Sequence, residues 1–126
     1  MSEQISLEEL ENAIIVDTKV VADKKVTTLT KQIYDFNVLE VEVGTTGYKG
    51  GDTGHGGRSY IRIQDLTSTD IKIRKLGNKY GENRGVEIIL GGDAELRTIL
   101  RAFHFIAETL EISLTQGTLE AIISRP

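Results

Sequence analysis

The sequence predicts an α+β domain, in which an antiparallel sheet of about five or six strands carries one main C-terminal helix packed on it. Two observations predict this class. Short segments rich in β-branched residues follow one another between residues 13 and 90, and a single long segment after residue 93 carries apolar residues at spacings of three and four. With 126 residues, the chain has the length of one domain, so we expect a single domain over residues 1–126.

The N-terminal quarter of the chain predicts a short helix and a hairpin. A capping box, SLEE, predicts the helix over about residues 7–12. The segments AIIVDTKVV and VTTLTKQIYDF, separated by ADKK, predict the two strands of the hairpin. Apolar residues in 26–36 also fit helical spacing, so strand and helix both stay open for that stretch.

The middle of the chain alternates between polar and apolar residues. In NVLEVEV, Val38, Glu40 and Glu42 fall on one face and Leu39, Val41 and Val43 on the other, which predicts a half-buried strand. SYIRIQDL and DIKIRKL repeat the pattern, and VEIIL predicts one more strand after a polar, glycine-punctuated loop at Asn78–Gly85. Asp93 is a suitable N-cap for the long helix, which we expect over about residues 94–111.

The long helix has two faces of different character. Its apolar stripe, expected to pack on the sheet, is Leu96, Ile99, Leu100, Phe103, Ile106 and Leu110. The opposite face carries Arg97, Arg101 and His104, which form either an ordinary solvated surface or a basic strip that binds an anion. Phe105 lies off the apolar stripe and suggests a second buried surface, most simply a homo-oligomer interface.

Residues 44–60, GTTGYKGGDTGHGGRSY, hold seven of the chain's 13 glycines. Ordering so many glycines is costly in backbone entropy. The segment is either a long hairpin loop without a ligand, or a nest of backbone N–H groups that binds phosphate. In the second case the guanidinium of Arg58 would hold the phosphate bidentately, and His55 with Tyr48 or Tyr60 would stack on a base. The candidate ligand-binding residues here are Tyr48, His55, Gly56, Gly57, Arg58 and Tyr60.

The sequence lacks the residues that several kinds of binding and catalytic site require. GGDTGHGGR has no Gly-Lys-Ser/Thr and precedes a predicted strand, so it is neither a P-loop nor a dinucleotide fingerprint. Two histidines and no cysteine fall short of a metal-ligand cluster, and no orienting acid for nucleophilic catalysis is identifiable, so we expect no catalytic residues, no metal and no cofactor. A net charge of −4 argues against duplex nucleic acid as a partner. The polar N-terminus and the lack of a long apolar run predict a cytoplasmic protein that does not bind membranes.

GYKGGDTGHGGRSYIRI, followed by a strand-rich middle and a C-terminal helix with arginines, resembles the first Thoeris anti-defence family of phage-encoded sponges. The resemblance implies a small, cytoplasmic, non-enzymatic protein that sequesters cyclic ADP-ribose isomers. Similar members also trap cyclic trinucleotides of another immune system (CBASS) and assemble as dimers or as hexamers built from dimers. Their pockets lie where helices of one subunit meet the sheet of another. By this resemblance Arg58, Arg97 and Arg101 are the phosphate-binding candidates, and Tyr80 and Asn83 are candidates for contacts with a base.

The sequence therefore predicts non-enzymatic sequestration of a cyclic nucleotide. Two alternatives remain open at this point: a nucleotide phosphodiesterase or hydrolase that uses His55, and a phage accessory protein that binds a host protein.

Overall fold

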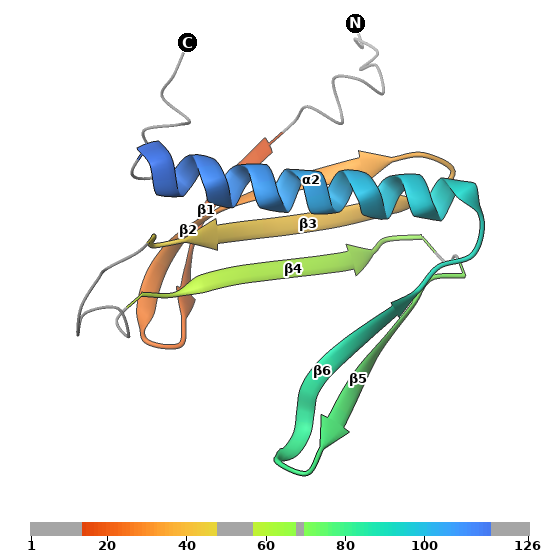
Figure 1. Ribbon diagram of the computed structural model, residues 1–126. Helices are drawn as coiled ribbons and strands as arrows, with labels where there is room; N and C mark the ends of the chain where they lie inside the picture. The colour runs from red at the N-terminus through yellow and green to blue at the C-terminus, as the bar shows by residue number, and fades with distance from the viewer. Residues whose placement is uncertain (1–13, 48–56, 68–69, 117–126) are drawn as a thin grey trace, which may run out of the picture.

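The computed structural model describes residues 14–47, 57–67 and 70–116, and within them it confirms the α+β class (Figure 1). Antiparallel strands form a four-stranded sheet and a separate two-stranded sheet. The helix expected over residues 7–12 lies outside the described residues. The elements are β1 (Ile14–Val21), β2 (Lys24–Tyr34), β3 (Val38–Thr45), β4 (Ser59–Asp65), β5 (Lys72–Asn78), β6 (Gly81–Ile89) and α2 (Asp93–Gln116).

The four-stranded sheet has the order β1-β2-β3-β4, with each strand antiparallel to its neighbours. The predicted N-terminal hairpin is confirmed, and β2 continues to Tyr34, so residues 26–36 are mostly strand and not helix. A two-residue turn with Ala22 at φ 58° joins β1 to β2. The β-branched side chains of these segments favour the extended conformation over the helical spacing that they also fit.

One face of this sheet packs against α2, which lies across β2 and β3 (Figure 1). The buried core between them consists of Ile33, Leu39, Val41 and Val43 from the strands with Ile99, Ala102 and Ile106 from the helix. Burying a side chain of the size of Leu or Ile contributes about 1.5–3 kcal/mol each, so this layer dominates the stability of the fold. The buried Asn37, between β2 and β3, also donates from Nδ2 to Thr98 Oγ1 at 2.8 Å and joins the sheet to the helix.

The predicted apolar stripe of the helix is only partly the face that packs on the sheet. Ile99 and Ile106 are buried as expected, but Leu96, Leu100 and Phe103 are 58%, 54% and 49% exposed. The buried face instead includes the small or polar residues Thr98, Ala102, Thr109 and Ser113, which allow the helix to lie close to the strands. We call the outward row of Leu96, Leu100, Phe103, Ala107, Leu110 and Leu114 the lateral stripe; all of these are exposed except Leu110, which is half-buried.

The start of α2 and the environment of Phe105 also differ from expectation. Leu96 N donates to Gly92 O, so Gly92, at φ 89°, caps the helix and Asp93 is its first helical residue. Phe105 packs against the core cluster of its own chain, and Lys31 Nζ lies 5.6 Å from the centre of its ring. It therefore does not by itself require a partner subunit.

β5 and β6 form a two-stranded arm that projects away from the larger sheet (Figure 1). The prediction of a loop at Asn78–Gly85 is wrong, because β6 already begins at Gly81 and only Lys79 and Tyr80 separate β5 from β6. Asn78 Oδ1 accepts from Tyr80 N at 2.8 Å, and both Gly81 and Asn83 have positive φ. These residues were expected to break structure, but here they form a tight hairpin because asparagine and glycine tolerate its backbone angles.

The base of the arm is tied to the first turn of α2. Ile71, Ile88 and Leu90 pack against the core, and the buried carboxylate of Glu95 accepts Asp70 N at 3.0 Å and Gly91 N at 2.8 Å. One side chain of the helix thus holds the chain on both sides of the arm.

Gly44 in β3 provides a stability test of the sheet. A Cβ at this buried position would overlap the Thr27 carbonyl oxygen and lie 2.9 Å from Thr28 Cγ2, so β2 can approach β3 here only because residue 44 is glycine. We expect Gly44→Ala to lower the free energy of unfolding by about 3 kcal/mol, the upper part of the usual range for overpacking. Urea denaturation of this variant measures the loss. Gly85→Ala is the matched control, because its Cβ would make only ordinary contact with Leu76, and a similar loss in both variants would contradict the expectation.

Candidate functional site

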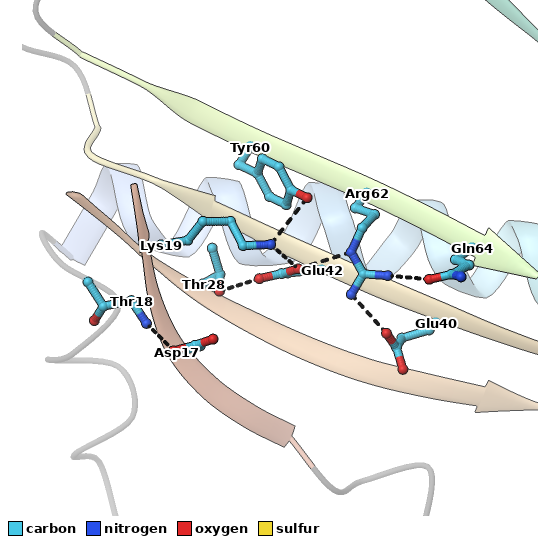
Figure 2. A network of polar contacts seen from close by, with 9 residues as sticks. All are labelled: Asp17, Thr18, Lys19, Thr28, Glu40, Glu42, Tyr60, Arg62 and Gln64. Atoms are coloured by element: carbon cyan, nitrogen blue, oxygen red, sulfur yellow. Dashed lines mark hydrogen bonds and ion pairs between the residues drawn. The ribbon is translucent and has the colours of Figure 1, made fainter. Parts of the chain in front are cut away.

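The main polar cluster of the described residues lies on the face of the four-stranded sheet opposite α2 (Figure 2). It draws side chains from all four strands: Lys19 from β1, Thr28 from β2, Glu40 and Glu42 from β3, and Tyr60, Arg62 and Gln64 from β4. We call this set the inner cluster. The alternation expected for β3 and β4 is confirmed, since Glu42 lies directly opposite Arg62 in the ladder.

Glu42 is the centre of the inner cluster. Only 4% of it is exposed, and its carboxylate accepts three hydrogen bonds, from Lys19 Nζ at 2.9 Å, Thr28 Oγ1 at 2.7 Å and Arg62 Nε at 3.0 Å. Burial pushes the pKa of Glu42 upward, but the hydrogen bonds from these three donors outweigh it, so the pKa is lowered from its ordinary value. Glu42 therefore stays ionised at neutral pH.

Lys19 reaches across the whole sheet. Its Nζ donates to Tyr60 Oη at 3.2 Å and lies 4.3 Å from the centre of the Tyr60 ring, although two strands separate β1 from β4. In a flat sheet these strands would be about 14 Å apart. Figure 1 shows β1 and β2 bending away from α2 toward the turn that joins them. This curl brings Lys19 toward Tyr60 and places the inner cluster in the concavity of the sheet. The hydrogen bonds to Glu42 and Tyr60 raise the pKa of Lys19.

Arg62 completes the cluster. Its guanidinium donates to Glu42, to Glu40 Oε1 at 2.8 Å and to Gln64 Oε1 at 2.8 Å. Burial lowers the pKa of Arg62, but the hydrogen bonds to Glu40 and Glu42 outweigh it and raise the value overall. Gln32 Nε2 is the main cause of the lowered pKa of Glu40. Two cations and two carboxylates thus neutralise one another, and this arrangement stabilises the curl without offering a net charge to a ligand.

Arg58 occupies a separate place, at the end of the glycine segment. Its backbone is held by Thr46: Arg58 N donates to Thr46 Oγ1, and Thr46 N donates to Arg58 O, both at 2.9 Å. Arg58 Nη2 lies 2.9 Å from Asp23 Oδ1 in the β1–β2 turn, and Nη1 donates to Gly57 O at 2.7 Å. The guanidinium is thus placed at the end of the sheet, partly exposed and facing an exposed carboxylate. Tyr48, His55 and Gly56 lie outside the described residues.

The basic residues of α2 lie at the opposite end of the sheet. Arg97 forms a two-point ion pair with Asp35 at 2.9 and 3.2 Å, and Arg101 Nη1 donates to Tyr34 O at 3.0 Å. The hydrogen bond from Arg97 lowers the pKa of Asp35, and the same contact raises the pKa of Arg97. His104 is exposed one turn further along the helix.

These two basic regions are far apart within one chain. The C-terminal end of α2, at Leu110 and Leu114, borders a cavity of about 220 Å³ with Thr45, Gly47 and Ser59. Ser59 follows Arg58 in the chain and pairs with Thr45, so this cavity lies at the end of the sheet where Arg58 is held. Thirteen helical residues, about 20 Å, separate Arg101 from Leu114. One small ligand therefore cannot contact Arg58 and the Arg97–Arg101 pair of the same chain.

Three further candidate residues belong to neither basic region. Tyr80 and Asn83 are at the exposed tip of the arm (Figure 1), where Lys79 Nζ lies 5.1 Å from the Tyr80 ring. Tyr60 belongs to the inner cluster, and one face of its ring is covered by Lys19 (Figure 2).

Sequence reasoning missed Phe36. It is 91% exposed in the turn between β2 and β3, next to Asp35, which Arg97 holds. An exposed aromatic ring beside two arginines has the chemistry to stack on a base near a bound phosphate. The signal was present in the sequence as YDFN between two strands, but the possible helical spacing of residues 26–36 obscured the turn.

Neither a metal cluster nor a membrane span is found in the described part of the chain. Residues 14–47, 57–67 and 70–116 contain no group of three or more histidine, cysteine, aspartate or glutamate side chains placed to hold a metal ion. Within the same ranges, no helical segment combines the length and the apolar character that a bilayer crossing requires. Comparisons with protein-family models, curated proteins and solved structures give no match for this chain.

Neutralising Glu42 tests the role of the inner cluster. We expect Glu42→Gln to lower the free energy of unfolding at pH 7 by about 2–3 kcal/mol, less than for a fully buried pair because Lys19 and Arg62 are about a third exposed. Thermal and urea denaturation measure it. Glu82→Gln on the arm is the matched control, because this exposed carboxylate carries the same change, and we expect almost no effect.

The same cluster predicts a pH dependence. The pKa values of Glu40 and Glu42 are lowered in the folded chain, so their contribution is fully present above the unfolded value of about 4.5 and is lost as the pH falls through the folded values. We expect stability to fall steeply below about pH 4.5 in the wild type and less steeply in Glu42→Gln. Parallel pH profiles of the two proteins would contradict a role for Glu42 in this dependence.

Proposed function

We propose that this chain is a phage-encoded, non-enzymatic binding protein that sequesters a cyclic nucleotide signal in the host cytoplasm and thereby blocks anti-phage defence. The ligand is a cyclic ADP-ribose isomer, a cyclic oligonucleotide, or both. The observation that supports this most directly is the placement of Arg58, whose guanidinium is fixed at the exit of the glycine segment and faces an exposed carboxylate.

A phosphate is a suitable replacement for that carboxylate. Aspartate and phosphate offer an arginine fork the same two-oxygen geometry, so the contact with Asp23 represents the kind of anion that Arg58 can hold. A surface ion pair contributes at most about 1 kcal/mol, whereas a charge-assisted hydrogen bond to a ligand phosphate contributes about 1.5–3 kcal/mol. A ligand phosphate surrounded by glycine N–H groups would therefore displace Asp23.

The shifted pKa values favour binding over catalysis. Among the described residues, the resolved shifts lower the values of the acids Asp35, Glu40 and Glu42 and raise those of the bases Lys19, Arg62 and Arg97. Each group therefore keeps its charge at neutral pH. A general acid or base needs the opposite, a value moved toward neutrality.

The second basic region gives the proposal a second contact. Arg97 and Arg101 hold Asp35 and Tyr34, next to the exposed Phe36, and His104 follows one turn along the helix; this combination suits a phosphate with an attached base. Because this region and Arg58 are too far apart for one ligand within one chain, we expect the complete site to form in a homo-oligomer, as a dimer or a hexamer built from dimers. The tip residues Tyr80 and Asn83 remain candidates for a contact from another subunit.

Arg58→Ala tests the site directly. We expect it to weaken binding of a cyclic ADP-ribose isomer or cyclic trinucleotide by roughly ten- to a hundred-fold, and Arg58→Lys to restore only part of this, because an ammonium lacks the planar fork. Titration calorimetry with each ligand measures the change. Two controls keep the result specific. Asp23→Asn removes the internal carboxylate and should leave affinity unchanged or raised, while Arg74→Ala removes an exposed arginine in the middle of the arm, away from Tyr80 and Asn83, and should have no effect. Equal losses in all three would contradict a specific role for Arg58.

Recovery of the ligand separates binding from turnover. We expect a cyclic nucleotide incubated with the protein to be released intact after heat denaturation, and His55→Ala to leave that outcome unchanged. Chromatography of the released ligand is the measurement. Time-dependent conversion by the wild type that disappears in His55→Ala would favour a phosphodiesterase or hydrolase, and no binding of any cyclic nucleotide would favour a partner among host proteins.

A further inference from the structure

The lateral stripe of α2 has the spacing of a coiled-coil seam. Its members follow one another at steps of four, three, four, three and four residues, from Leu96 to Leu114. This alternation is the heptad repeat by which one helix packs along another. The stripe lies beside the row that packs on the sheet, and among the described residues no apolar layer covers the exposed Leu96, Leu100 and Phe103.

We propose that two copies of the chain pair through this stripe, with their α2 helices antiparallel and related by a two-fold axis. A seam with a heptad repeat requires a helix with the same repeat, and α2 of a second copy supplies it. The pairing is isologous, because the same stripe is used on both copies. It does not depend on any ligand.

The sizes of the side chains select the antiparallel direction. When the two helices run in opposite directions, Leu96 faces Leu114 of the second copy, Leu100 faces Leu110, and Phe103 faces Ala107. The largest residue of the stripe then lies opposite the smallest. In a parallel pair, two Phe103 side chains would share one layer and two Ala107 side chains the next, so that an overpacked layer would adjoin a hollow one.

The charges beside the stripe select the same direction. After the acidic first turn with Asp93 and Glu95, the first half of α2 carries Arg97, Arg101 and His104, and the second half carries Glu108 and Glu111. The antiparallel pair places the Arg97–His104 segment of each helix along the acidic second half of the other, with Arg97 near Glu111 of the second copy. A parallel pair would place like charges together, and such juxtapositions fix orientation in coiled coils.

The pairing also brings together the two basic regions, a consequence that rests on the proposed function. Leu114 lies at the end of the sheet where Arg58 leaves the glycine segment, and Leu96 lies beside Arg97. Facing Leu96 with Leu114 of the second copy therefore brings Arg97 and Phe36 of one copy toward Arg58 of the other. The dimer would have two such places, one at each end of the paired helices.

Cross-linking tests the direction, and the chain has no native cysteine to interfere. Arg97→Cys and Glu111→Cys, both at exposed positions, are purified separately and treated with a short bismaleimide, alone and mixed. We expect covalent dimers in the mixture and few in either variant alone. Dimers in each variant alone, with no greater yield in the mixture, would overturn the antiparallel direction. Glu82→Cys on the arm, mixed with either variant, controls for random collisions.

Exchanging the large and the small residue of the lateral stripe tests how the two helices pack. We expect light scattering of the wild type at micromolar concentration to give twice the 13.9 kDa chain mass, or three times that dimer mass if the dimers assemble into a hexamer. Phe103→Ala and Ala107→Phe should each raise the dimer dissociation constant by at least about tenfold, and the double variant should recover most of the loss, because its large and small residues still face each other. A monomeric wild type would overturn the pairing and leave the stripe to residues outside the described ranges or to another protein. A monomer that still bound a cyclic nucleotide would overturn the pairing alone.

Discussion

The buried carboxylate of Glu42 is the contact on which the shape of the molecule depends. Three donors from three different strands converge on it, and the lysine among them also reaches Tyr60 on the far strand. A carboxylate so deeply buried is stable only with such partners, and the curl of the sheet helps to bring Lys19, from the more distant β1, over Glu42. The curl places polar residues in the concavity and leaves the other face for the apolar layer under α2.

This arrangement explains why the most prominent charges of the chain do not form its most promising binding site. Charges in the inner cluster are matched within the cluster, and their hydrogen-bonding capacity is used by neighbouring strands. Charges at the two ends of the sheet, by contrast, include exposed side chains, Asp23 at one end and Arg97 at the other. An incoming anion reaches these ion pairs more easily than it reaches Glu42. Location, and not the number of charged residues, separates the structural Arg62 from the arginines that we propose to bind a ligand.

The sequence predicted well the features that depend on the local pattern of polar and apolar residues. Alternation located β3 and β4 and correctly assigned the polar face of Glu42 and Arg62, because a half-buried strand has a period of two residues. It could not predict that Lys19 would join them, since that contact depends on strand order and on the curl. The helix stripe was half wrong for a similar reason: periodicity shows that Leu96 and Ile99 are apolar, but not which of two adjacent rows the sheet covers. The tight turn at Lys79 and Tyr80 was missed because asparagine and glycine occur in loops and hairpins alike. Of the candidate site, Arg58 could be singled out from its glycine neighbours, whereas Phe36 required knowledge of where β2 ends.

The carboxylate of Glu95 links the direction of the arm to that of the helix. It holds the backbone on both sides of the arm, and it belongs to the first turn of α2, so the arm and the helix terminus share one anchor. The nine residues of β6 extend about 30 Å from that anchor. A rotation of about 5° at the anchor would therefore move the tip of the arm by about 2–3 Å. The arm thus acts as a lever, and Tyr80 at its tip magnifies small tilts at the start of the helix that would be hard to detect within the sheet itself.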